Sequence, residues 1–322
     1  MKSILEFQEK FEQYLQEQQF NNSPKELYEP VHYILSLGGK RIRPALVLLA
    51  TKAFGGNVAT AFPLAFVMEL FHNFTLVHDD IMDNASLRRG NPTVHVKYNN
   101  NTAILSGDVM MIWCYNYLTN LPDDKFKAVF ELFNDTAIKV CEGQQMDMVF
   151  ETKAIVAEEE YLKMIEYKTS VLLACCLKAG AILSNATSDD AEKMYEFGLN
   201  IGLTFQVQDD ILDAFGAADK VGKEQGGDIK NNKKTLLLIN ALQVAKDNDA
   251  NTLQTLLDSN DEQKVPQTLA LFQQLGVKQY AENVAANFHQ KAFTALDTIT
   301  ALSESDKQDL KLFAEYLLNR EQ

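Results

Sequence analysis

The sequence predicts an all-α protein of one domain. Long stretches rich in Leu, Ala, Glu and Lys repeat their apolar residues with the 3.6-residue period of a helix, and no stretch shows a convincing two-residue strand alternation. The seven prolines fall mostly where helices are expected to begin or end. With 46% hydrophobic residues the chain can bury a large core. No linker divides it, so we expect a single domain over residues 1–322.

The expected helices of the first half are bounded by Gly, Asn and Pro. They cover 3–20, then Pro24 to about Gly38, then 42–54, and then a long apolar stretch that Pro63 is expected to start and that ends in an acidic cluster near residue 80. Residues 84–101 are rich in Arg, Gly, Asn and Pro, and we expect them to form a loop.

The second half continues the helical pattern. Helices are expected at about 102–120, 124–150, 159–184 and 190–214, the last of which ends in a second acidic cluster. Residues 217–234 form a Gly- and Lys-rich loop, and 235–320 are helical with breaks near 248, 260, 276 and 302.

Charge and cysteine content exclude several classes of function. The net charge of −14 argues against a nucleic-acid partner. The four cysteines lie in apolar helical segments without zinc spacing, which fits free thiols in a reducing cytoplasm. The first residues show no signal peptide, and no run reaches the ~18 apolar residues of a membrane span, so we expect a cytoplasmic protein without a stable membrane span.

One acidic signature occurs twice, as Asp79-Asp80-Ile81-Met82-Asp83 and as Asp209-Asp210-Ile211-Leu212-Asp213. On a helix the three carboxylates of each copy fall within an arc of about 100°. A single copy is usually a solvated helix face. Two copies with the same spacing predict bound cations, because like charges at i and i+4 repel. Two facing clusters would suit Mg²⁺, which commonly bridges carboxylates to phosphates.

Cationic and polar residues occur in the segments that could complete a phosphate site. Each has an ordinary alternative: a basic helix start, an internal ion pair, a solvated loop lysine or a structural histidine. The candidates are Lys40, Arg41 and Arg43 on a Gly-flanked turn, His72, Arg88 and Arg89, Lys168 with Thr169, and Lys223 and Lys233.

Taken in order, these segments resemble the trans-isoprenyl diphosphate synthases, the polyprenyl synthetase family, along nearly the whole chain. The shared segments are Gly39–Pro44, His78–Asp83, Arg88-Arg89-Gly90, Gly143–Asp147, Lys168-Thr169, Phe205–Asp213, Lys223, and Gly227-Asp228 with Lys233 and Thr235. One departure is visible, because Asn232 stands where the family usually has Gly before Lys233. Asn tolerates left-handed backbone, so the turn is expected to survive, and either Lys233 or Lys234 could reach a phosphate.

The resemblance implies a fold, a reaction and a site. The fold is a bundle of long helices around a deep central cavity, and the reaction is head-to-tail condensation of isopentenyl diphosphate with an allylic diphosphate. Three Mg²⁺ ions, or Mn²⁺ as a substitute, would be held by the six aspartates: Asp79, Asp80, Asp83, Asp209, Asp210 and Asp213. Arg88, Lys168 and Lys223 would complete the clamp on the allylic diphosphate. Thr169 and Gln206 would stabilise the allylic cation. Lys40, Arg43, His72 and Arg89 would bind isopentenyl diphosphate, with Phe205 against its apolar end. Arg41, Gln144 and Lys233 are further expected substrate-binding residues.

Product length and assembly are also expectations from the resemblance. Phe74, Phe71 and Met68, at steps of three residues before Asp79, would form the floor of the product cavity, with small Thr75 beside them. This favours C15 to C20 products, with C20 geranylgeranyl diphosphate slightly ahead. A homodimer is expected through 102–118 and 124–141. The alternatives are a longer-chain polyprenyl diphosphate synthase, a terpene cyclase, a head-to-head synthase and a non-catalytic helical subunit.

Overall fold

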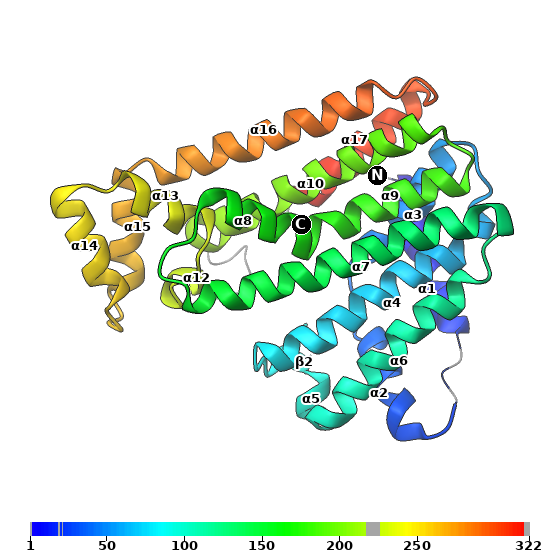
Figure 1. The fold of residues 1–322 in the computed structure, drawn as a ribbon, viewed down its shortest axis with the longest axis horizontal. Helices are drawn as coiled ribbons and strands as arrows, with labels where there is room; N and C mark the ends of the chain where they lie inside the picture. The colour runs from blue at the N-terminus through cyan, green and yellow to red at the C-terminus, as the bar shows by residue number, and fades with distance from the viewer. Residues whose placement is uncertain (1, 19, 21, 217–225, 319–322) are drawn as a thin grey trace. The chain divides into compact units, whose positions relative to one another are not determined.

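The computed structural model describes residues 2–18, 20, 22–216 and 226–318, which are almost entirely helical and confirm the all-α prediction (Figure 1). Contacts along the backbone divide the chain into two compact units. Unit 1 holds the described residues of Met1–Asp135, Cys175–Tyr195 and Ile299–Leu310, and unit 2 those of Thr136–Ala174, Glu196–Thr298 and Lys311–Gln322. The expectation of a single domain stays a prediction.

Unit 1 is built around one apolar helix. Helix α4 (Val58–Met82) packs against α3 (Ile42–Ala53) and α6 (Asn100–Leu118), while α1 (Lys2–Glu17) lies on α3 and α2 (Lys25–Ser36) lies on α6 (Figure 1). Almost every side chain from Leu64 to Phe71 is buried. Because α4 is enclosed on several sides, its acidic end is held by a rigid core.

Helix α4 differs from its prediction in two ways. It begins at Val58, not at Pro63, because the side chain of Asn57 accepts a hydrogen bond from Ala59 N and caps the helix. It is also long and apolar enough to cross a membrane, with a mean hydropathy of 1.3, contrary to the expectation that no segment would be. The core helix of a soluble protein passes the same test, and 61% of the window is buried within the structure.

Residues 84–99 contain local structure that the sequence did not predict. Strand β1 (Leu87–Arg88) pairs antiparallel with β2 (Asn91–Pro92), and a short helix α5 (Val94–Lys97) follows. The turn residues Arg89 and Gly90 have φ of 53° and 76°, the left-handed pair of a tight hairpin. A two-residue strand is too short to show an alternating pattern, so the segment was predicted as a loop.

Long helices supply residues to both units. These are α7 (Asp123–Thr152), α9 (Val171–Leu183), α10 (Ser188–Phe215) and α17 (Glu304–Leu318). The single helix expected over 159–184 is instead three segments: α8 (Glu158–Ile165), a π-helical turn η1 (Glu166–Ser170) and α9. The π turn therefore interrupts the helix at Lys168 and Thr169.

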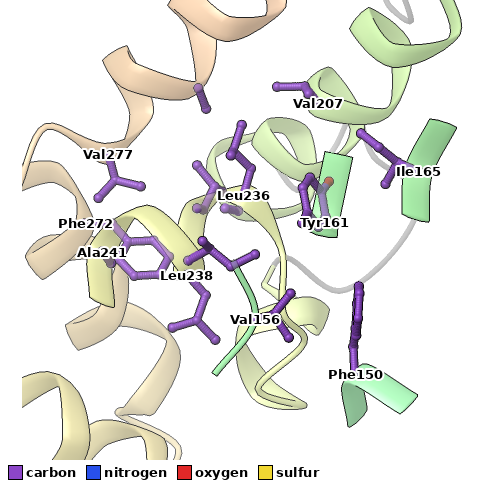
Figure 2. Packing of buried hydrophobic residues seen from close by; sticks show 14 of the residues in the cluster. Phe150, Val156, Tyr161, Ile165, Val207, Leu236, Leu238, Ala241, Phe272 and Val277 are labelled. Atoms are coloured by element: carbon purple, nitrogen blue, oxygen red, sulfur yellow. The ribbon is translucent and has the colours of Figure 1, made fainter. Parts of the chain in front are cut away.

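The rest of unit 2 encloses its own core. After α12 (Gly227–Lys230) come α13 (Leu236–Val244), α14 (Asp247–Leu257), α15 (Lys264–Gln274) and α16 (Val277–Asp297), close to the expected breaks. Figure 2 shows the core, in which side chains of α8, α10, α13, α15 and α16 meet. The labelled members include Tyr161, Ile165, Val207, Leu236, Leu238, Phe272 and Val277. This packing fixes α10 and the second acidic cluster to α8 and α13.

Candidate active site

The first acidic cluster lies at the end of α4, and its members differ in environment. Asp80 is 1% exposed and accepts two hydrogen bonds from Arg88, Nε to Oδ2 at 2.7 Å and Nη2 to Oδ1 at 2.6 Å. Asp79 is partly buried and Asp83 is exposed. On a helix, residues i and i+4 share a face that residue i+1 does not. Asp79 and Asp83 therefore share a face that could hold a metal, whereas Asp80 is bound to Arg88. The metal role of all three stays a prediction.

The β1–β2 hairpin separates the two arginines of the Arg88-Arg89-Gly90 segment. Arg88 is the last residue of β1, and its side chain reaches Asp80, whereas Arg89 is the first residue of the turn, and its guanidinium donates to the carbonyl of Gly38. A Cβ on Gly39, whose φ is 140°, would lie 2.9 Å from Arg89 Cζ. Glycine is therefore needed for Arg89 to sit against this turn.

Arg41 was predicted to bind substrate, but in the structure its side chain is buried and bonded to three other helices. It is 4% exposed and has a left-handed φ of 44°. Its guanidinium donates to Glu69 Oε1 at 2.6 Å, to Glu12 Oε2 at 2.9 Å and to Leu35 O at 2.7 Å. These bonds hold the turn to α1, α2 and α4. The geometry thus supports a structural role for Arg41 and no substrate contact.

Positive charge gathers around His72 in unit 1. Burial lowers the pKa of His72 well below its usual range, and Arg43, Arg89, Arg88 and Arg41 lower it further, so the ring is neutral. Burial also lowers the pKa of Arg43, and its Nε is buried without a hydrogen-bond partner among the described residues. Such a group attracts an anion that can accept several hydrogen bonds. Lys40, which is exposed on the turn that precedes α3, adds a further positive charge to this cationic group.

The second acidic cluster, on α10, repeats the pattern of the first. Asp210 is 9% exposed, and its Oδ2 accepts hydrogen bonds from the Tyr161 hydroxyl and from Leu236 N at 3.3 Å. Burial raises the pKa of Asp210 to about 7, and the Tyr161 hydroxyl opposes that shift. Asp209 and Asp213 are partly buried, and Asp213 accepts from Asp228 N at 3.0 Å. The middle aspartate again has internal hydrogen-bond partners, and the metal role of Asp210 stays a prediction.

A small hollow lies beside this cluster in unit 2. Asp213, Asp228 and Lys233 line it, and Lys233 Nζ lies 3.6 Å from Asp228 Oδ1. Asn232 has a φ of 52°, which confirms the expected left-handed backbone. Of the two lysines that follow it, Lys233 is the one that lines the hollow. The candidate Lys223 lies outside the described residues.

The π turn brings Lys168 to a carboxylate that the sequence analysis did not nominate. Lys168 Nζ lies 2.6 Å from Asp147 Oδ2 on α7. Asp147 belongs to the quoted Gly143–Asp147 segment, so its place within a shared motif was the signal that could have found it. Thr169, Phe205 and Gln206 are partly buried in unit 2, and Gln144 is buried on α7.

The donor set fits a hard divalent cation bound together with substrate. Within the residues that the structure describes, no three His, Cys, Asp or Glu side chains converge to hold a metal by themselves. Mg²⁺ commonly takes one or two carboxylates and completes its shell with water and phosphate oxygens. Asp79 with Asp83, and Asp209 with Asp213, offer that kind of partial set.

Aromatic side chains line up along α4 behind the first cluster. Phe74 is 4.8 Å from His78 and 5.7 Å from Phe71 between ring centroids, and Phe71 is 5.3 Å from Phe133 of α7. Phe71 and Met68 are fully buried, whereas Phe74 and Thr75 are partly exposed. The sequence analysis missed Phe133, because only tertiary contact places it beside α4.

Comparison with known proteins gives the family. Residues 24–275 match the family model described as Polyprenyl synthetase. The chain belongs to the polyprenyl synthetase family. It is 38% identical over 301 residues to a short chain isoprenyl diphosphate synthase of Methanothermobacter thermautotrophicus, covering 93% of this chain and 92% of that one.

Other polyprenyl synthetases agree in sequence and in fold. The chain is 38% identical over 303 residues to the geranylgeranyl diphosphate synthase of Methanosarcina mazei, covering 92% and 91% of the two chains. A crystal structure of a geranylgeranyl pyrophosphate synthase superposes with a TM-score of 0.94 at 39% identity, covering 99% of each chain. These relatives confirm the predicted family and its all-α fold, and the chain is a prenyltransferase.

Proposed function

We propose that the protein condenses isopentenyl diphosphate with allylic diphosphates to form C20 geranylgeranyl diphosphate. One observation carries this proposal. Unit 1 alone contains a cationic group around Arg43 and His72 and the acidic group Asp79 and Asp83, and Arg88 both bonds the adjacent Asp80 and acts electrostatically on His72. The first group suits a diphosphate bound by cations, and the second suits a diphosphate bound through metal. A terpene cyclase needs only the second.

In the proposed reaction the residues of the chain bind the substrates, orient them for attack and stabilise the charge of the leaving diphosphate. Arg43, Arg89, Lys40 and neutral His72 hold the isopentenyl diphosphate through charge and hydrogen bonds, and so place its double bond for attack. Asp79, Asp83, Asp209 and Asp213 would hold divalent cations, Mg²⁺ in the first instance, which would supply positive charge to the leaving diphosphate. Lys168, which is held by its ion pair with Asp147, adds positive charge that stabilises the leaving diphosphate.

The later steps use polar groups near the second cluster. Thr169 and Gln206 direct oxygen dipoles at the allylic cation, and Phe205 packs against the apolar part of isopentenyl diphosphate. The released diphosphate takes the final proton, so no side-chain base is required. The curated relatives support the C20 length, since several are named geranylgeranyl diphosphate synthases, whereas that of Natronomonas pharaonis is named for geranylfarnesyl diphosphate.

The test is a product analysis of the purified full chain. Isopentenyl diphosphate is mixed in turn with dimethylallyl, geranyl and farnesyl diphosphate and Mg²⁺, and the products are measured by mass spectrometry. We expect C20 diphosphate from all three, with one inorganic diphosphate per condensation. Products of C25 or longer would support the longer-chain alternative. Cyclic hydrocarbon, or no product, would overturn the proposal.

A further inference from the structure

The π turn η1 has no cause in its own sequence. Glu166–Ser170 contains neither Gly nor Pro, and the helical pattern of 159–184 runs through it without a break. A π turn is rare and frequently occurs at a functional site. The contacts around it must therefore hold it open, and two glycines of unit 2 supply those contacts.

Gly143 of α7 lies directly against the backbone of this turn. A Cβ at Gly143 would lie 2.7 Å from Tyr167 C and 2.8 Å from Lys168 Cα, and closer still to Lys168 N. Real Cβ contacts shorter than 3.0 Å essentially do not occur. All three neighbours are backbone atoms, so no rotamer change can make room for a methyl group.

Gly202 of α10 touches the other end of the turn. A Cβ there would lie 2.6 Å from Ser170 Cα, 2.7 Å from Ser170 Cβ and 2.8 Å from Ser170 Oγ. Ser170 is fully buried, and its hydroxyl donates to Ile165 O at 3.3 Å, within the widened turn. The two glycines therefore confine the turn between α7 and α10.

Each glycine also shares a helix face with a polar residue of the proposed site. Asp147 follows Gly143 by four residues, and Gln206 follows Gly202 by four, so each pair lies one turn apart on one face. Lys168 Nζ reaches Asp147 Oδ2 at 2.6 Å. The helix faces that contact the π turn therefore also carry Asp147 and Gln206, the polar residues that act with Lys168 and Thr169 in the proposed function.

We propose that Gly143 and Gly202 are positioning residues for the ionisation step. By admitting the backbone of η1 to direct contact, they hold Lys168 beside Asp147 and fix Thr169 in the adjoining position of the turn. The inference rests on the proposed function. Neither glycine touches substrate, and each acts through the π turn.

The experiment compares Gly143→Ala and Gly202→Ala with a matched control, Gly180→Ala. Gly180 on α9 is also tightly confined, since its Cβ would lie 2.6 Å from Val47 O and 2.9 Å from Ala50 Cβ, and it stands ten residues beyond the last residue of the π turn, Ser170. Steady-state kinetics give kcat and the KM of each substrate, and thermal unfolding gives Tm. A displacement near 1 Å can lower a rate by roughly 100-fold.

We expect both site variants to lose kcat by roughly 10- to 100-fold with the KM for isopentenyl diphosphate unchanged, and the larger loss at Gly143. The control should lose Tm and keep kcat. Adding Ser170→Gly should partly rescue Gly202→Ala, because two of its three close contacts are to that side chain, and should not rescue Gly143→Ala. Unchanged kcat in both variants, or an equal loss in the control, would overturn the inference.

Two further measurements separate this inference from the proposed function. Hydrogen exchange of the peptide containing 166–170 should rise in both site variants and not in the control, whatever the wild-type protein synthesises; unchanged exchange overturns the positioning role. If the Ala variants do not fold, Asp147→Asn should lower kcat without changing the KM for isopentenyl diphosphate, and normal kcat there would overturn it. A wild-type chain that makes no prenyl product refutes the proposed function alone.

Discussion

At the scale of single residues, the two acidic clusters each combine a structural and a reactive part. Asp80 and Asp210 face inward, to Arg88 and to Tyr161, whereas Asp79 and Asp209 are partly exposed. The repulsion between adjacent carboxylates is reduced because an internal donor binds one of them. The same six aspartates therefore divide into positions that hold the helix end and positions that can hold metal.

Asp79→Ala and Asp80→Ala should consequently have different effects. Asp79→Ala should lower the rate of condensation by several orders of magnitude with the free energy of unfolding unchanged. Asp80→Ala leaves Arg88 without its buried partner and should lower the free energy of unfolding by about 3 kcal/mol. Urea unfolding and product formation measure the two effects, and equal stability of the two variants would contradict the division.

Arg41 provides a second test of a buried charge. Arg41→Lys cannot reproduce the three diverging hydrogen bonds of the guanidinium, so the free energy of unfolding should fall by about 2 kcal/mol. The KM for isopentenyl diphosphate should rise as the turn carrying Lys40 and Arg43 loosens. Glu12→Gln is the control: Glu12 is 41% exposed, and its loss should cost less than about 1 kcal/mol. An Arg41→Lys variant with an unchanged free energy of unfolding and an unchanged KM would contradict the structural role of Arg41.

At the scale of elements, α4 carries both the first acidic cluster and the aromatic side chains that are predicted to form the floor of the product cavity. Phe74 precedes Asp79 by five residues, and Phe71 stands one turn further back in contact with Phe133. A helix rises about 4.5 Å over three residues, close to the length of one isoprene unit. We therefore predict that each aromatic layer corresponds to roughly one added unit of product.

Removing these layers should lengthen the product. Phe74→Ala should shift the main product from C20 toward C25, and Phe71→Leu in that background should lengthen it again. Leu is chosen because truncating a buried Phe to Ala costs about 3–5 kcal/mol. Chain length is read by mass spectrometry after dephosphorylation, with Phe288→Ala, a partly buried residue of unit 2, as the control. Identical product lengths in all variants would refute the floor.

At the scale of the whole molecule, α6 carries large apolar side chains that the described residues of unit 1 leave exposed. Ile104, Leu105 and Ile112 are 42%, 58% and 61% exposed. Exposed large apolar groups along one helix commonly mark an interface. They lie within the stretch 102–118 in which a homodimer contact was predicted, and the oligomeric state stays a prediction.

Charge on this helix should separate such a dimer. Leu105→Glu with Ile112→Glu should convert the protein from dimer to monomer in sedimentation velocity at micromolar concentration. Ile155→Glu, at a residue that is 77% exposed in unit 2, should not. A wild-type protein that sediments as a monomer with full activity would contradict the prediction.

Sequence reasoning predicted most helices because apolar periodicity and capping residues are local. It missed the roles of Arg41 and Asp147, because their partners lie on other helices far along the chain: Glu12 and Glu69 for Arg41, and Lys168 for Asp147. The π turn was equally invisible, since its cause is tertiary contact with two glycines. The inward position of Asp80 was predictable in principle, because i+1 leaves the face shared by i and i+4.

The π turn also limits which mutations of this gene the protein can tolerate. A π turn holds about one residue more than the α-helical turn it replaces, so losing a single codon within 166–170 would restore a regular helix. The register of α8 would then rotate by about 100° relative to α9. Tyr161 would turn away from Asp210, and its buried carboxylate would lose that donor. In-frame deletions here should therefore be far more damaging than missense changes at Glu166, which is partly exposed.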